Sequence, residues 1–309
     1  MSYLSLITPT NIAEEREKFF SSTTYSPQLE YKWDNVHIQK YKKDPALLEL
    51  TDALISGDNN QITSAAELYF NIKFLDDDIL KAKEFVKVVP DKIHITPEEY
   101  AELANKKFTE FEVGYKAKVV DKHGFQGRPN HKTKMLSLSK YLNPDFLTVD
   151  GLVNHELVHI IRAVNGEHNG IEVQQGYLAT EEGLASFIQD KQLKETTASV
   201  FQHALEYLAA YIARDCGFRE VYDFLIAHGS SPDNAWLRGI RQKFGIRDTA
   251  KPGSLMKSAM CFYHELKVST LRQDELTRLF IGKIEQTNLA NFPTYNGKIP
   301  IDKIHELLN

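Results

Sequence analysis

The chain has 309 residues, of which 42% are hydrophobic, and it carries a formal net charge of −5 with an isoelectric point near 6.1. This length can bury a sizeable core, and the acidic balance argues against nonspecific nucleic-acid binding, which needs a basic surface. Cys216 and Cys261 are too few for a disulfide framework, so we expect free thiols in a reducing compartment. The sequence shows neither a signal-peptide pattern at its start nor a long apolar run. We therefore expect a cytoplasmic protein without a membrane span, or one exported without a cleaved signal.

The chain divides into two expected regions. Residues 1–95 form a helical N-terminal region and residues 96–309 the catalytic region, with one continuous domain as the alternative. Residues 1–28 are expected to be irregular apart from one short helix. Residues 44–72 predict two helices, because the Gly-Asp-Asn-Asn sequence at 57–60 interrupts an otherwise helical pattern.

The catalytic region begins with an acidic helix followed by short strands. The segment PEEYAELANKKFTEF at 97–111 predicts the helix, and the alternation in EVGYKAKVV at 112–120 predicts a strand. The sequence HGFQGRPNH at 123–131 predicts a turn, and KMLSLSK at 134–140 predicts the returning strand of a hairpin. An edge strand of such a small sheet could pair with the extended backbone of a substrate.

The segment HELVH at residues 155–159 carries the chemistry of a zinc peptidase. Residues four positions apart lie on one face of an α-helix, so His155 and His159 can bind one ion while Glu156 acts beside it as general base. The alternative is that both histidines are satisfied core residues, but a buried Glu156 would then have no partner. The motif therefore favours a site for one Zn²⁺ ion.

The surrounding sequence places this motif on a buried helix. Thr148 is a candidate N-cap, and Asn165-Gly166 is the expected end of the helix. Apolar residues recur at helical spacing between them, at Leu152, Val153, Leu157, Val158, Ile160, Ile161 and Val164.

A catalytic zinc site usually has three protein ligands and one open position, so one ligand is still missing. The continuation H-E-x-x-H-x-x-G-x-x-H would supply a third histidine, but this chain has Arg162 and Asn165 where that pattern has glycine and histidine. The other known source is a glutamate on the following helix. The segment TEEGLASF at 180–187 provides two candidates, Glu181 and Glu182.

We assign Glu182 as the third ligand. Thr180 is a natural N-cap, which would place both glutamates in the first turn of a helix, where the ionised form is favoured. Gly183 destabilises the helix by about 1 kcal/mol relative to alanine. A glycine at this position is explained if the helix must approach the zinc-bearing helix closely, because glycine has no side chain.

Three neighbours are candidates for positioning the ligands. Glu181, if it is not itself the ligand, would be exposed to solvent or paired with Arg162, one turn beyond His159; an ordinary surface ion pair is the alternative. Ser186, one turn beyond Glu182, could hydrogen-bond a ligand histidine. Further along, the chain is expected to be mostly helical, with a break at 229–233 and a loop at 291–300 before a last short helix.

These motifs resemble the tyrosine-carboxypeptidase-like zinc metallopeptidase family, which includes the microtubule-associated tyrosine carboxypeptidases. The segment NHELVHIIRAVNG at 154–166 is similar to the family's H-E-I-G-T-H-x-x-R-x-x-N, although this chain has one residue fewer between the histidines. The segment TEEGLASF matches the family's T/Q-E-E/x-G-L-A, in which the glutamate before glycine is the third ligand. The resemblance therefore also implies Glu182.

Two further segments carry the resemblance, which extends from about residue 64 to about residue 270. SAAELYF at 64–70 is similar to S-x-x-L-Y-G, and the segment at 235–258 is similar to A-W-x-x-x-x-R-x-K-R-G-x-x-D-T-x-x-P-G-x-x-x-K-D. Phe244 and Ser258 depart from this pattern, where the family has a basic residue and an aspartate. The matching residues are Ala235, Trp236, Arg241, Lys243, Gly245, Asp248, Thr249, Pro252, Gly253 and Lys257.

The resemblance also suggests residues for the substrate side. A carboxypeptidase needs a cation that binds the terminal carboxylate of its substrate. Arg241 and Lys257 are the first candidates because they match basic positions of the family. Arg238 and Lys243 are further candidates for this role, and ordinary solvated side chains are the alternative for all four.

A tetrahedral oxyanion needs a donor opposite the metal. Tyr263 and His264 are candidates because they follow the family-like segment, while a core tyrosine and a surface histidine are the alternatives.

The expected fold class is α+β and predominantly helical, a gluzincin-like metallopeptidase with a small sheet beside the zinc helix. The favoured function is a zinc carboxypeptidase that removes a C-terminal residue, with tyrosine or another aromatic residue implied by the resemblance, from a peptide or protein. The alternatives are a zinc endopeptidase acting on one specific protein and a non-catalytic zinc-binding protein.

Overall fold

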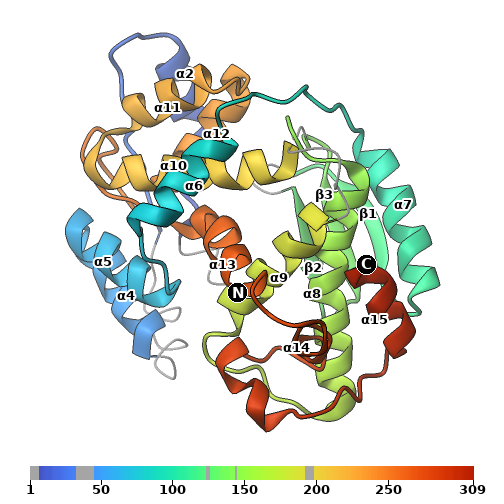
Figure 1. Ribbon diagram of the computed structural model, residues 1–309. Coiled ribbons are helices and arrows are strands. Elements are labelled where there is room, and N and C mark those ends of the chain that lie inside the picture. Colours follow the sequence, from blue (N-terminus) through green and yellow to red (C-terminus); the bar gives the residue numbers. More distant parts are fainter. Residues whose placement is uncertain (1–6, 33–44, 123–125, 143–144, 192–197) are drawn as a thin grey trace. The chain divides into compact units, whose positions relative to one another are not determined.

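The computed structural model is predominantly helical with one three-stranded sheet, which confirms the expected α+β class (Figure 1). Contacts divide the chain into two compact units: unit 1 comprises residues 1–89 and 203–260, and unit 2 comprises 90–202 and 261–309. Residues 203–260 thus belong with the N-terminal part, unlike in the expected division near residue 95. In the described part of the chain, no helix has the length and apolar character required to cross a bilayer. The structure describes residues 7–32, 45–122, 126–142, 145–191 and 198–309.

Unit 1 is helical and contains the two helices expected between residues 44 and 72. The side chain of Asp58 accepts hydrogen bonds from the backbone N–H groups of Asn60 and Gln61, which starts the second of these helices after the break. The helices of this unit are α2 (Ile12–Phe20), α4 (Pro45–Ser56), α5 (Asn59–Tyr69), α6 (Asp76–Phe85), most of α10 (Ala198–Asp215), α11 (Phe218–Ala227), α12 (Pro232–Gln242) and the 3₁₀ turn η1 (Lys257–Ala259).

Unit 2 contains the sheet, the helix that carries the HELVH motif and the C-terminal helices. Its first helix is the acidic helix expected after Pro97, and a capping box between Thr96 and Glu99 begins it. Its elements are α7 (Pro97–Glu110), β1 (Lys116–Val120), β2 (Gly127–Asn130), β3 (Met135–Ser139), α8 (Val149–Asn169), α9 (Tyr177–Lys191), nearly all of α13 (Met260–Val268), α14 (Gln273–Leu279), the 3₁₀ helix η2 (Gln286–Asn291) and α15 (Ile301–Leu308).

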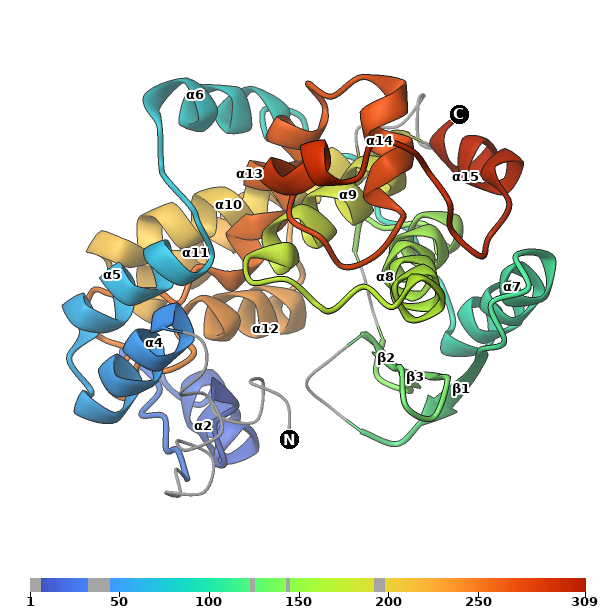
Figure 2. The ribbon, with the colours of Figure 1, turned by 90° about the horizontal axis from the view of Figure 1, so that it is seen from below.

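The sheet is not the predicted hairpin. Its order is β1-β3-β2, with β1 parallel to β3 and β2 antiparallel to it, so residues expected to form the turn form an edge strand instead. The sequence predicted a turn here because the strand contains Gly127 and Pro129, and both residue types are rare within strands. The tight turn lies just after it, where the side chain of Asn130 accepts hydrogen bonds from the N–H groups of Lys132 and Thr133. The edge strand β2 lies next to α8 (Figure 2).

Helix α8 begins where the sequence predicts and ends later. The Thr148 hydroxyl accepts a hydrogen bond from the N–H of Gly151, which confirms the expected N-cap. The predicted stop at Asn165-Gly166 is wrong, since the helix continues to Asn169 and ends at Gly170 in the left-handed conformation, with φ of 64°. Asn165 instead fixes the C-terminal part of the unit: its amide donates to the carbonyl of Phe280.

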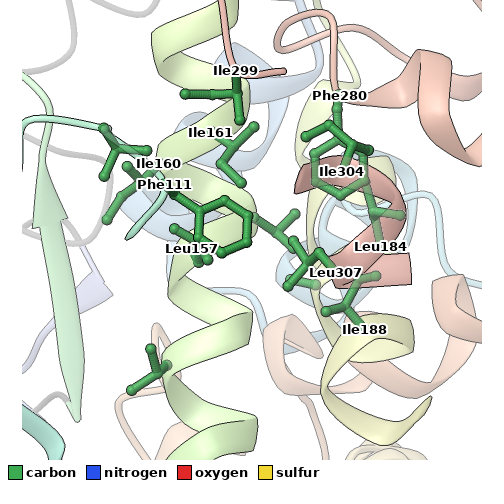
Figure 3. Close-up of a cluster of buried hydrophobic side chains, with 14 of the residues drawn as sticks. Phe111, Leu157, Ile160, Ile161, Leu184, Ile188, Phe280, Ile299, Ile304 and Leu307 are labelled. Atoms are coloured by element: carbon green, nitrogen blue, oxygen red, sulfur yellow. The ribbon is translucent and has the colours of Figure 1, made fainter. Parts of the chain in front are cut away.

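The apolar faces of α8 and α9 are buried in one core. Residues of α8 pack with residues of α9 and of the C-terminal helices α14 and α15, and this contact holds the two site-bearing helices in place (Figure 3). Figure 3 shows Leu157, Ile160, Ile161, Leu184, Ile188, Phe280, Ile299, Ile304 and Leu307 in this cluster.

Within unit 1, a buried lysine connects three chain segments. The Lys243 side chain has no exposed surface, and its Nζ donates to the carbonyl oxygens of Ala213 (2.9 Å), Cys216 (2.6 Å), Lys251 (3.0 Å) and Gly253 (2.9 Å). These carbonyls belong to the end of α10 and to the loop after α12. The side-chain nitrogen of Lys243 therefore joins the end of α10 to the loop after α12, where the N–H of Gly253 also donates to the Ala213 carbonyl.

We expect Lys243→Met to lower the free energy of unfolding by about 2–4 kcal/mol, because methionine fills the space but removes the donor that these four carbonyls share. Urea denaturation followed by circular dichroism measures the change. Lys251→Met is the control, because the Lys251 side chain is 70% exposed and should change the stability by less than about 0.5 kcal/mol. Equal stability of the two variants would contradict this role of Lys243.

Candidate metal centre

Helices α8 and α9 bring His155, His159 and Glu182 together. One potential ligand atom from each of these residues lies within 4.8 Å of the other two, and His155 Nε2 is 3.6 Å from Glu182 Oε2. A tetrahedral zinc ion with bonds of about 2.0–2.1 Å separates its ligand atoms by about 3.3 Å, so these groups need only small movements to fit one ion. Helix α8 is α-helical throughout the motif, and the four-residue spacing of His155 and His159 therefore places both imidazoles on one face.

Glu182 lies in the second turn of α9, because the helix begins earlier than predicted. The helix starts at Tyr177, three residues before the expected cap Thr180. The Thr180 hydroxyl instead accepts a hydrogen bond from the N–H of Gln286. The carboxylate of Glu182 is therefore placed by helix packing rather than by an N-cap at residue 180.

Gly183 permits a close approach of α9 to α13, whereas the sequence suggested an approach to the zinc-bearing helix. A Cβ atom at Gly183 would lie 2.7 Å from the backbone carbonyl of His264, a distance that a real side chain could not keep. The backbone of α13 thus comes next to the residue that follows Glu182. The Sγ atom of Cys261, at the start of α13, lies 4.0 Å from Glu182 Oε2.

The two candidate oxyanion donors, Tyr263 and His264, are neighbours on α13 and both are buried. Their rings are in edge contact with a centroid distance of 5.0 Å, and Lys267 Nζ lies 4.0 Å from the Tyr263 ring centroid. His264 is therefore not the surface residue considered as one alternative. Both residues belong to the same unit as the three candidate ligands.

A buried carboxylate, Glu181, holds the imidazole of His159. Glu181 is 2% exposed, and its Oε1 lies 2.9 Å from His159 Nδ1 and accepts a hydrogen bond of 2.6 Å from Lys283 Nζ. Its Oε2 pairs with Arg162 Nη1 at 3.3 Å. The contact at Nδ1 leaves Nε2 as the nitrogen available to a metal. Of the two sequence alternatives for Glu181, the structure shows pairing with Arg162, and the pair is buried rather than at the surface.

The charges around Glu181 outweigh the cost of its burial. Burial alone would raise the pKa of this carboxyl, but Lys283, His159 and Arg162 together lower it to about 2. For His159 the effect of burial has the opposite sign and would lower the pKa of the imidazole. The hydrogen bond to Glu181 outweighs this effect, and the pKa of His159 is raised. Glu181 is therefore ionised and acts as a strong acceptor for the imidazole.

Sequence reasoning did not find Lys283. It lies between α14 and η2, 102 residues after Glu181, and no local pattern marks it. Lys283 is held at the site by Arg162. The guanidinium group of Arg162 donates hydrogen bonds to the backbone carbonyls on both sides of Lys283, those of Gly282 (3.0 Å) and Ile284 (2.6 Å). The buried arginine thus fastens this segment to α8.

Glu156, predicted to be the general base, follows His155 directly on α8. Burial raises the pKa of its carboxyl against the opposing effect of His159 and His155. Its Oε2 atom is buried and has no hydrogen-bond partner among the described residues. Gly127 of the edge strand leaves room for the other oxygen, since a Cβ there would lie 2.7 Å from Glu156 Oε1.

The structure does not join Ser186 to a ligand histidine. Its Oγ atom and the Nδ1 atom of His155 are both buried, and neither has a hydrogen-bond partner in the part of the chain that the structure describes. The expected contact between Ser186 and a histidine is therefore absent from the described residues.

The four candidate carboxylate-binding cations lie in unit 1, whereas the three candidate metal ligands lie in unit 2. Arg238 is buried near Glu206, with Nε 3.8 Å from Oε1, and Lys243 is bound to backbone carbonyls as described above. Arg241 and Lys257 are half-buried.

No protein-family profile matches the sequence. The chain is similar to microtubule-associated tyrosine carboxypeptidase 1 of Mus musculus, with 25% identity over 319 aligned positions that cover 96% of this chain and 64% of that protein. It is 24% identical to microtubule-associated tyrosine carboxypeptidase 1 of Homo sapiens over 270 positions, covering 82% of this chain and 53% of that protein. The chain thus spans less than two thirds of the length of these relatives. The two matches confirm that the chain resembles the tyrosine-carboxypeptidase-like family over most of its length.

Proposed function

We propose that the protein is a zinc-dependent carboxypeptidase that removes a C-terminal tyrosine or another aromatic residue from a peptide or protein. The observation that carries this proposal is the convergence of His155, His159 and Glu182 beside the buried carboxylate of Glu156. The names of the two relatives, both tyrosine carboxypeptidases, support the choice of reaction and of leaving residue.

The donor set suits one zinc ion. Two imidazole nitrogens and one carboxylate oxygen are the ligands of many catalytic zinc sites, and such sites keep a fourth position open. The ion, when bound, would polarise the carbonyl of the cleaved bond and lower the pKa of an attacking water. The unpartnered Oε2 atom of Glu156 supports this assignment, because a buried carboxylate oxygen normally has a proton donor.

Glu156 would transfer a proton from the attacking water to the leaving amine. Its carboxylate takes a proton from the attacking water and later delivers it to the amine that leaves, which is general base and then general acid catalysis by one group. A buried carboxyl with a raised pKa suits both steps, because the protonated form is then less costly.

The remaining residues would position the substrate and stabilise charge. Glu181 fixes the ring of His159, and Tyr263 and His264 on α13 are the proposed donors to the oxyanion. Arg241 and Lys257 remain the proposed partners of the terminal carboxylate, since they match basic positions of the family.

A zinc endopeptidase is the second candidate function. The edge strand β2 lies next to α8 and could pair with an extended substrate backbone, and such pairing does not require a chain end. The two functions differ in their response to a blocked C-terminus.

We expect Glu156→Gln to lower the rate of peptide cleavage by about 10²–10⁴-fold while zinc stays bound, because glutamine cannot accept the proton of the water. Mass spectrometry of the products and metal analysis of the purified protein measure the two effects. Glu102→Gln, at an exposed site on α7, is the control and should keep full activity. Wild-type rates in Glu156→Gln would exclude Glu156 as the general base.

Removal of zinc with a chelator should abolish cleavage, and added zinc should restore it. A panel of peptides with free and amidated C-termini then tests the type of cleavage. We expect release of single C-terminal residues from the free peptides and none from the amidated ones. Internal cleavage of both forms would instead establish the endopeptidase.

Glu181→Gln should weaken zinc binding by about 10–100-fold, because the amide is a poorer acceptor for His159 and leaves Lys283 and Arg162 without a counter-charge. Competition with a zinc-binding dye measures the affinity without any need for a substrate. Unchanged affinity, with a normal circular dichroism spectrum, would contradict the positioning role of Glu181.

A further inference from the structure

A tyrosine hydroxyl and a glycine lie beside the carboxylate of Glu156 in unit 2. A Cβ atom at Gly127 would lie 2.7 Å from Glu156 Oε1, 3.2 Å from Glu156 Cδ and 3.3 Å from the hydroxyl oxygen of Tyr100. The carboxylate and the hydroxyl therefore face the same side of Gly127. The three residues come from three elements, with Tyr100 on α7, Gly127 at the start of β2 and Glu156 on α8.

The side chain of Tyr100 is fixed in the protein interior. It has no exposed surface, and its ring belongs to the same hydrophobic core as Val153 and Leu157 of α8. Its hydroxyl donates a hydrogen bond of 3.1 Å to the backbone carbonyl of Leu152. In an α-helix this carbonyl also accepts the N–H of the residue four positions later, which here is Glu156. The hydroxyl of Tyr100 is therefore held at the turn of α8 that carries Glu156.

The hydroxyl of Tyr100 keeps its proton. Burial raises the pKa of Tyr100 well above its usual value, and the negative charge of Glu156 raises it further. The side chain therefore remains a neutral hydrogen-bond donor beside the carboxylate. The dipole of a neutral hydroxyl can stabilise a nearby carboxylate, whereas a phenolate would repel it.

Gly127 provides the space in which the carboxylate of Glu156 lies. The atoms that a Cβ at this position would approach belong to the side-chain ends of Glu156 and Tyr100 rather than to the backbone. Core packing fixes the ring of Tyr100, but the carboxylate of Glu156 is at the end of a flexible side chain. A methyl group at residue 127 would therefore displace the carboxylate and leave the strand in place.

We infer that Tyr100 and Gly127 position the carboxylate of Glu156 for proton transfer, an inference that rests on the proposed peptidase function. Tyr100 bounds the carboxylate on the side of α7, and Gly127 leaves room for it next to β2. A general base must lie within hydrogen-bond reach of the proton that it takes, and a misplacement of about 1 Å can lower the rate by about 100-fold. Both residues act through Glu156, so they are positioning residues.

The test compares Gly127→Ala and Tyr100→Phe, each alone and each combined with Glu156→Gln. The kcat and KM for release of tyrosine from the C-terminus of a short peptide are measured by mass spectrometry, and zinc affinity by competition with a zinc-binding dye. Tyr295→Phe is the matched control, because it also removes a hydroxyl that donates to a backbone carbonyl, that of Ile299. Thermal denaturation checks that all variants are folded.

We expect Gly127→Ala to lower kcat by about 10–100-fold and Tyr100→Phe by about 2–10-fold, with KM and zinc affinity changed by less than about twofold. Neither substitution should lower the residual rate of Glu156→Gln, because the position of residue 156 no longer matters once the base is lost. Tyr295→Phe should keep the wild-type kcat. Equal losses in the presence and absence of Glu156 would overturn the inference.

A crystal structure of Gly127→Ala tests the same inference without any need for activity. We expect a displaced carboxylate of Glu156 beside an unchanged strand β2, and a carboxylate in its original place would contradict the positioning role of Gly127. Failure of the wild-type protein to cleave any peptide, together with a displaced carboxylate in Gly127→Ala, refutes the peptidase function alone. Cleavage by wild-type protein at a rate that neither substitution changes refutes the positioning role alone.

Discussion

The candidate metal centre depends on one buried negative charge, the carboxylate of Glu181. A carboxylate in a protein interior is costly unless cations and hydrogen bonds compensate it, and here His159, Arg162 and Lys283 all do so. The same contact orients the imidazole of His159, so compensation of the charge and placement of a ligand are achieved together. The C-terminal part of the chain contributes the lysine, which makes it part of the centre although it holds no ligand.

The sequence predicted the parts of the site that follow helical periodicity. His155 and His159 lie on one helix face because their spacing matches the helical repeat. The N-cap at Thr148 also followed from local chemistry. These two features could be predicted because each depends on residues within a few positions of one another. Glu182 lies on the next helix, and it was proposed because a zinc site needs a third ligand and because the family resemblance implies it.

Features set by distant contacts could not be predicted. Lys283 joins the site only because Arg162 binds the carbonyls around it, and Gly183 faces α13 rather than α8. The edge strand β2 was mistaken for a turn because it contains glycine and proline. In each case tertiary packing determines the outcome, and a single sequence carries no local sign of it.

The link between Arg162 and the segment around Lys283 has a consequence for the order in which the protein matures during synthesis. All three proposed zinc ligands are synthesised about a hundred residues before Lys283. Until Lys283 has been made, Glu181 lacks one of its cationic side-chain partners, and the carbonyls that bind Arg162 do not yet exist. The buried charge of Glu181 is therefore fully compensated only after the segment around Lys283 has been made.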